Sequence, residues 1–132
     1  MIPQSYIFSR PQNAIQGQFY RPGQSDWAVL CSRDGASTIL IYPAGKVRAV
    51  EELAREKDQL HIETTQEGAA IFGFLRLIRP IGEEWIVSHY DAYGGPKPPP
   101  IDHQGIDDAY VEHASVVRYW HNGQWLELTG AD

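Results

Sequence analysis

The sequence predicts an α+β fold: a mainly antiparallel β-sheet built from hairpins, with one strong helix over residues 83–93 and one short helix over residues 49–57. Three observations predict it. Short segments with alternating or β-branched apolar residues recur along the chain. Turn-forming pairs separate them, and Asn122-Gly123 is the clearest of these pairs. One segment carries an extended apolar face at helical spacing.

The chain has 132 residues, the usual length of a single domain with its own core, so we expect one globular domain over residues 1–132. Its first part, residues 1–25, is polar and contains three prolines. We therefore expect an extended N-terminal arm there, with one short strand at Tyr6–Phe8.

The first hairpin is expected from two strands, Asp26–Ser32 and Ser37–Tyr42, joined by a tight turn over residues 33–36. Alternation in the first strand places three apolar side chains on one face, which we expect to be the buried face: Trp27, Val29 and Cys31.

The short helix over residues 49–57 is predicted because Val50, Leu53 and Ala54 recur at helical spacing. Glu51 and Arg55 form an i,i+4 pair that would stabilise it weakly.

A second hairpin is expected from Leu60–Thr65 and Ile71–Ile81, with a turn at Glu67-Gly68. A third is expected from Ser115–His121 and Gln124–Thr129 around Asn122-Gly123.

The strong helix, residues 83–93, begins with Glu83 and Glu84, which favour a helix N-terminus, and is followed by Gly94-Gly95-Pro96, which favours its end. Five side chains share one helical face: Trp85, Ile86, His89, Tyr90 and Tyr93. Residues 94–105 follow as a stiff loop, because three consecutive prolines favour polyproline II geometry.

Composition excludes several function classes. Acidic residues outnumber basic ones, 17 against 11, and there is no basic run, so we expect no nucleic-acid partner. No apolar run approaches the roughly 18 residues of a membrane span. The single cysteine, Cys31, cannot form an internal disulfide or a cysteine-based zinc site. The N-terminus lacks the pattern of a signal peptide, so we expect a cytoplasmic protein or the mature form of an exported one.

Two segments, Gly17–Leu30 and Asp102–Val111, share a weak internal repeat: each places a glycine three residues before an aspartate, at Asp26 and at Asp108. Gly17-Gln18-Phe19 and the Asp26–Leu30 strand start resemble the flanks of the FG-GAP or VCBS repeat of integrin-like β-propellers. That resemblance implies a strand-turn-strand unit and an exported protein. The Trp-rich final hairpin also resembles small bacterial domains of unknown function.

The resemblance does not extend to the calcium loop of that family. At the four ligand positions the first copy has Gln18, Tyr20, Pro22 and Asp26, and the second has Pro100, Asp102, Gln104 and Asp108. Prolines and a tyrosine cannot supply carboxylates, and calcium needs about six or more oxygens. We therefore expect no tightly bound metal and no cofactor.

The densest acidic segment leaves three interpretations open. Asp102 and Asp108, with Asp107 and Glu112 nearby, either hydrogen-bond loop amides, form a weak cation site, or act as an acid–base pair. The five histidines lack zinc-site spacing, and His89 is expected as a hydrogen-bonded core residue: His61, His89, His103, His113 and His121.

No nucleophile motif or glycine-rich phosphate loop is present in the sequence. Tyr119 and Trp120 point to opposite faces of a strand, so one of them is available outside the core. We predict a non-catalytic binding module for a protein or a small ligand, with the partner at the proline loop and these aromatics: Pro98, Pro99, Pro100, Tyr119 and Trp120. The alternative is a small hydrolase or cation-binding domain using Asp102, His103 and Asp108.

Overall fold

The computed structural model describes residues 13–58, 62–64, 72–74, 76–110 and 114–132. Ten strands and one α-helix follow one another in these ranges, with two short 3₁₀ turns, η1 and η2, after the third strand. Their bounds are β1 Ala14–Gly17, β2 Asp26–Arg33, β3 Ala36–Tyr42, η1 Pro43–Gly45, η2 Val47–Ala49, β4 Glu51–Lys57, β5 Ile62–Thr64, β6 Phe72–Phe74, β7 Arg76–Ile81, α1 Glu83–Tyr93, β8 Gly105–Tyr110, β9 Ala114–His121 and β10 Gln124–Thr129.

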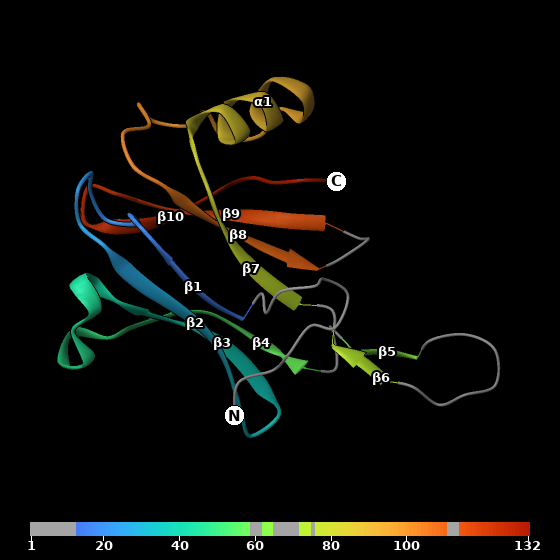
Figure 1. The fold of residues 1–132 in the computed structure, drawn as a ribbon. Coiled ribbons are helices and arrows are strands. Elements are labelled where there is room, and N and C mark those ends of the chain that lie inside the picture. The colour runs from blue at the N-terminus through green and yellow to red at the C-terminus, as the bar shows by residue number, and fades with distance from the viewer. Residues whose placement is uncertain (1–12, 59–61, 65–71, 75, 111–113) are drawn as a thin grey trace.

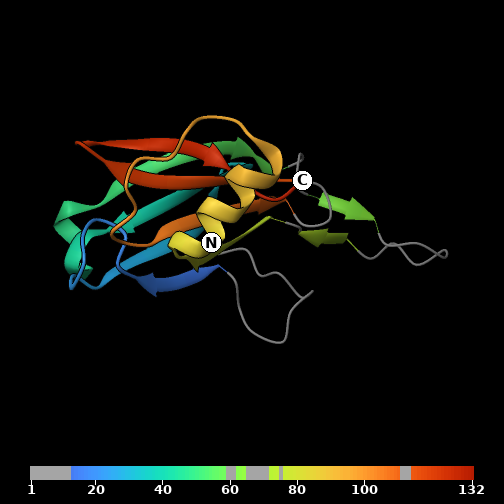
Figure 2. The same cartoon turned by 90° about the horizontal axis from the view of Figure 1, so that it is seen from above.

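The strands form three antiparallel sheets. The first has the order β1-β2-β3-β4, the second β10-β9-β8-β7, and β5 and β6 form a two-stranded ribbon. Figure 1 shows three layers, with α1 lying on the second sheet and the first sheet on the other side; Figure 2 shows the ribbon projecting beyond one end. The structure therefore confirms a mainly antiparallel α+β fold.

Two apolar clusters hold the three layers together. Between the sheets lie Ile15, Phe19, Leu30, Ile39, Ile41, Ile78 and Ile106. Between the second sheet and α1 lie Ile81, Ile86, Val117, Tyr119 and Leu128. The alternation of side chains along β9 explains the division, since Val117 and Tyr119 point toward α1 whereas Arg118 points toward the first sheet.

Two hairpins confirm the predicted turns. Arg33 pairs with Ala36 around Asp34-Gly35, and His121 pairs with Gln124 around Asn122-Gly123. The turn residues have positive φ, 53° and 76° in the first turn and 50° and 80° in the second. These are the angles of a type I′ turn, which matches the right-handed twist of paired strands.

The helix expected over residues 49–57 is wrong. The segment is strand β4, which pairs antiparallel with β3, for example Leu53 with Ile39 and Glu51 with Ile41. A register shift and a positive φ of 57° at Ala54 show a bulge in this strand. Because of the extra residue in the bulge, the neighbouring side chains of Leu53 and Ala54 both pack against the core. Two adjacent apolar residues on one face are typical of a helix, and this pattern produced the wrong prediction.

The buried face predicted for β2 is also wrong. Ala28 and Leu30 are fully buried, whereas Trp27 is 43% exposed and Val29 and Cys31 are half-buried. The reason is that the loop before β2 needs the carboxylate of Asp26 inside, and strand alternation then places Ala28 and Leu30 inside as well.

The extended arm expected over residues 1–25 is wrong for residues 13–25. Within the described residues, β1 pairs with β2, and Ile15 and Phe19 belong to the core between the sheets. The expected strand Tyr6–Phe8 and the turn Glu67-Gly68 lie outside the described residues.

The second predicted hairpin is confirmed where it is described, because Ile62 pairs with Phe74 and Thr64 with Phe72. The continuous strand expected over 71–81 is wrong, because Arg76–Ile81 leaves the ribbon and pairs with β8. The two parts of the expected strand, β6 and β7, therefore belong to different sheets.

The helix α1 begins and ends where the sequence predicted. Gly82 is its N-cap, and Gly94, with φ 76°, donates its amide to the carbonyl of Tyr90 at its end. Ile86 is buried, and His89 stacks on Trp85 while its Nδ1 lies 2.7 Å from the carbonyl oxygen of Trp85. In the part of the chain that the structure describes, no helix has the length and apolar character needed to cross a membrane.

Candidate functional site

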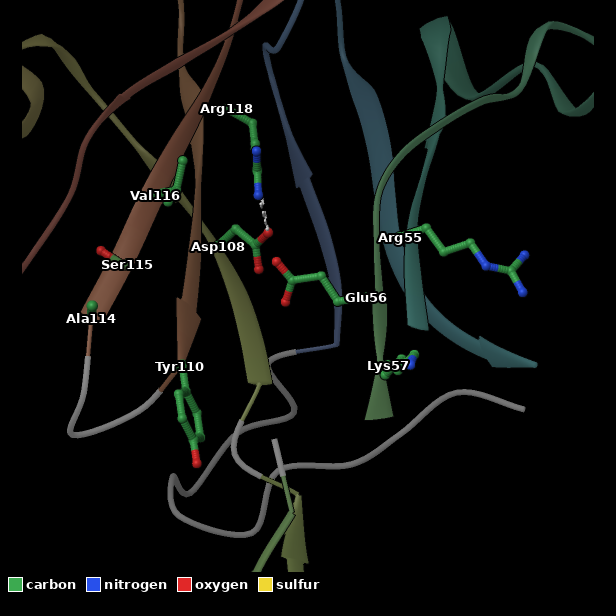
Figure 3. A pocket seen from close by; sticks show the side chains of 9 residues that line it. All are labelled: Arg55, Glu56, Lys57, Asp108, Tyr110, Ala114, Ser115, Val116 and Arg118. Atoms are coloured by element: carbon green, nitrogen blue, oxygen red, sulfur yellow. Dashed lines mark hydrogen bonds and ion pairs between the residues drawn. The ribbon is translucent and has the colours of Figure 1, made fainter. Parts of the chain in front are cut away.

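A pocket of about 770 Å³ opens between the two sheets, at the end where β4 and β8 finish and β9 begins. Figure 3 shows the side chains of these three strands around it. The described residues that line the pocket are Arg55, Glu56, Lys57, Asp108, Tyr110, Ala114, Ser115, Val116 and Arg118.

A buried ion-pair cluster stands behind this pocket, centred on Asp108. Arg76 is fully buried, and its Nε and Nη2 donate to the two carboxylate oxygens of Asp108 at 2.9 Å each. Its remaining N–H groups donate to the hydroxyl and carbonyl oxygens of Ser37 and to the carbonyl oxygen of Ala54. A guanidinium has five N–H groups, so Arg76 is fully bonded. It connects β7 to both β3 and β4.

Arg118 shares the same carboxylate but is not fully bonded. Its Nε and Nη2 donate to Oδ2 of Asp108 at 3.3 and 3.1 Å, and its Nη1 donates to Glu127 at 2.6 Å. Its side chain is 9% exposed. Among the described residues these contacts use three of the five N–H groups, so one N–H on each Nη is left at the pocket wall.

Basic and acidic side chains both line the pocket. Arg55, Lys57 and Arg118 are basic, and Glu56 and Asp108 are acidic. Figure 3 shows Glu56 directed toward Asp108, whereas Arg55 extends away from it. Glu56 and Tyr110 each have an interaction of their own within the protein. The wall opposite β4 consists of Ala114, Val116 and the ring of Tyr110. An apolar wall with a few converging polar groups is typical of small-ligand sites.

Ser115 lines the pocket but is not placed as a nucleophile. Its hydroxyl accepts a hydrogen bond from the amide of Ala131 at 2.7 Å, and its own amide donates to the carbonyl of Ala131. These two bonds fix the C-terminal residues to the start of β9. No histidine is among the described residues that line the pocket, so no described imidazole is positioned to activate this hydroxyl.

Asp102 and His103 form a unit at the opposite end of the sheets. The Nδ1 of His103 lies 2.6 Å from Oδ1 of Asp102, its Nε2 lies 2.9 Å from the carbonyl oxygen of Trp120, and its ring stacks on Tyr119. Both ring nitrogens therefore lie within hydrogen-bond distance of oxygen atoms of the protein, and Nδ1 also lies 3.1 Å from the hydroxyl of Tyr119. This hydrogen bond from His103 lowers the pKa of the Asp102 carboxyl. Desolvation by burial raises the pKa of Tyr119.

The contacts of His103 give it a structural role. A general base needs a nitrogen that can reach a substrate proton, and both nitrogens of this ring are engaged by the protein. They attach the proline-rich loop to β9. Gln104 extends the attachment, since its amide donates to the carbonyl of Gln18 and its side chain accepts from the amide of Gln18.

The predicted acid–base or cation pair, Asp102 and Asp108, is divided between two settings. Asp102 is exposed beside His103, whereas Asp108 is bonded to two arginines. Neither side chain hydrogen-bonds loop amides in the contacts of the described residues. Side chains alternate along β8, so Asp107 lies on the face toward α1, opposite to Asp108. It is buried and bonded to Arg79 at 2.7 Å. Among the described residues, no group of three or more potential ligands is placed to hold a metal ion.

The two segments that resemble propeller repeats also differ in setting. Asp26 is buried at the start of β2, and its carboxylate accepts from the amides of Phe19, Tyr20 and Ala44 and from the side chain of Gln24. It organises a loop, as an aspartate in a turn does. Asp108 instead lies within a strand and is bonded to arginines. The repeat relationship stays a prediction.

The predicted partner surface is brought together only in part. The bond from His103 to Trp120 does place the end of the proline loop beside β9. Pro98 and Pro99 are half-buried, Pro100 is exposed, and Tyr119 is fully buried. Trp120 lies on the other face and is half-buried in an aromatic cluster with Tyr20 and Trp125, at ring distances of 5.0 and 5.5 Å.

Sequence reasoning missed the arginines of the pocket. Arg76 interrupts an apolar run, and Arg118 lies between Val117 and Tyr119 in a predicted strand. A charge on the inward face of a strand signals a buried partner, because an isolated buried charge is too costly. That signal was present for both residues, but the face that each would occupy depends on the separation of the strands into two sheets.

Comparison of the chain with protein-family models, with characterised proteins and with solved structures finds no match.

Proposed function

We propose that this protein is a non-catalytic binding module that takes a small ligand in the pocket between β4 and the β8–β9 strand pair. The pocket itself carries the proposal. It measures about 770 Å³, within the usual range of small-ligand sites. It combines an apolar wall with the partly unbonded guanidinium of Arg118.

Binding without turnover is supported by the engagement of the reactive groups. The hydroxyl of Ser115 and both nitrogens of His103 are hydrogen-bonded within the protein, and Asp108 is neutralised by two arginines. Catalysis by a side chain needs a group able to exchange a proton or form a bond with substrate. The rival, a hydrolase or cation-binding domain using Asp102 and Asp108, requires these two carboxylates to act together.

The test is a thermal-shift screen of a chemically diverse set of small molecules. It compares the wild type with a Val116→Trp variant, in which the larger side chain occupies the pocket. We expect ligands that raise the Tm of the wild type but not that of the folded variant, and that are recovered unchanged after incubation. Hits that bind both proteins equally, or that are converted by the wild type, would overturn the proposal. Trp27→Phe, a change at an exposed aromatic outside the pocket, is the control.

The proline-loop surface is a second candidate, for a protein partner. The observation in its favour is the His103–Trp120 bond, which attaches the end of the proline-rich loop to β9. Capture from native lysate with the wild type and with a Trp120→Ala, Pro98→Ser, Pro99→Ser variant tests it. Equal capture of one partner by both proteins would exclude this surface.

A further inference from the structure

We infer that the ligand of the pocket is a small organic monoanion, a carboxylate with an apolar body, whose head group binds Arg118. This inference rests on the proposed function and names the chemistry of its ligand. Three features of the pocket lead to it: the unused donors of Arg118, the charges of the lining side chains and the apolar wall.

The donors come first. Arg118 keeps one N–H on each Nη that no described residue accepts, and its side chain is 9% exposed. A buried guanidinium N–H without an acceptor costs free energy, and a carboxylate accepts from both Nη groups of an arginine at once. Lysine in the same place could offer a point charge but not this fork. The guanidinium is held in place by Asp108 and Glu127, so little entropy is lost when a ligand docks.

The charges of the lining side chains select the sign and size of the ligand charge. Arg118 is the lining cation that keeps N–H groups unused by the described residues, whereas Arg55 extends away from the pocket (Figure 3). Asp108 does not repel an anion strongly, because both of its oxygens accept from arginines. One negative charge on the ligand therefore matches the single guanidinium available to it. Glu56 lies on the β4 side and disfavours more highly charged ligands.

The apolar wall selects the rest of the ligand. Ala114, Val116 and the ring of Tyr110 lie on the β8–β9 side of the pocket. A carboxylate that reaches Arg118 has its hydrocarbon body along this wall, where burial of apolar area favours binding. The volume of about 770 Å³ is larger than a two-carbon acid fills, so longer or aromatic acids are expected to bind more tightly than acetate.

The experiment compares charged and neutral ligands of the same shape on the intact protein. Hexanoate and benzoate are titrated against hexanamide and benzamide, and the side-chain ¹⁵Nε–H signals of arginine are followed by NMR. We expect the carboxylates to move the Arg118 signal in a saturable way and to bind about tenfold or more tightly than the amides, because a charge-assisted pair is lost in the amides.

Two variants sharpen this comparison. Arg118→Lys keeps the charge and lowers carboxylate affinity, whereas Arg33→Lys, at an arginine whose side chain is 90% exposed, leaves it unchanged. If Arg118→Lys does not fold, the wild-type signals alone decide. Equal affinity for acids and amides, or saturable shifts confined to other arginines, would overturn the inference. The proposed function would still hold in that case if other ligands from the thermal-shift screen occupy the pocket.

Discussion

At the scale of single residues, the structure depends most on Arg76. Its five N–H groups join three strands from the two sheets, and its charge compensates Asp108 in the interior. We expect Arg76→Met to lower the free energy of unfolding by about 3–5 kcal/mol, because it leaves a buried carboxylate with one cation in place of two. Urea denaturation measures this loss.

A matched change at the surface separates burial from charge. Arg33 faces Asp34 at 3.8 Å with its side chain 90% exposed, so Arg33→Met is expected to change stability by about 0.5 kcal/mol or less. The double variant Arg76→Met, Asp108→Leu is expected to recover part of the loss, because it removes both buried charges. Equal losses for Arg76→Met and Arg33→Met would contradict the account of the buried cluster.

Asp102 is expected to make stability depend on acid pH. The hydrogen bond from His103 lowers the pKa of Asp102 below its ordinary value. A carboxyl whose pKa is lower in the folded than in the unfolded state stabilises the fold above the unfolded pKa, and this contribution is lost as pH falls through the folded pKa. The wild type should therefore lose stability more steeply than Asp102→Asn between about pH 5 and pH 2. Parallel urea midpoints for the two proteins over this range would refute the interaction.

At the scale of elements, the hairpin turns are the most sequence-determined parts of the fold. Gly123 has φ of 80°, and a Cβ placed there meets no atom within 4 Å, so backbone strain alone opposes a side chain. We expect Gly123→Ala to cost about 1 kcal/mol. Gly82 has the same open surroundings but φ of −106°, so Gly82→Ala should cost less. Thermal unfolding of the two variants compares them, and an equal loss would show that the turn geometry is unimportant.

The elements also show where local patterns mislead. Asn122-Gly123 and the apolar face of residues 83–93 predicted their hairpin and helix correctly, because turn angles and helical periodicity are local properties. Strand β4 was taken for a helix, because a bulge at Ala54 shifts the alternation by one residue. The prediction placed Trp27 and not Leu30 on the buried face of β2, because it considered only which face is more apolar. The hydrogen bonds that hold Asp26 inside cannot be read from the sequence.

At the scale of the whole molecule, the fold class was predictable and the pocket was not. The pocket requires β4 from one sheet and the β8–β9 pair from the other, and nothing local specifies how two sheets face each other. Sequence reasoning did choose Asp108, which lines the pocket, but interpreted it without its partners Arg76 and Arg118. Long-range pairing between charged side chains on separate strands decides its role.

A crystal structure of the protein with the tightest ligand from the thermal-shift screen tests the central claim most directly. The account predicts one intact molecule between β4 and the β8–β9 pair, in contact with Val116 and with its polar group on Arg118. A ligand bound instead at Pro98–Pro100 beside Trp120, or a cleaved product beside Asp102, would contradict it.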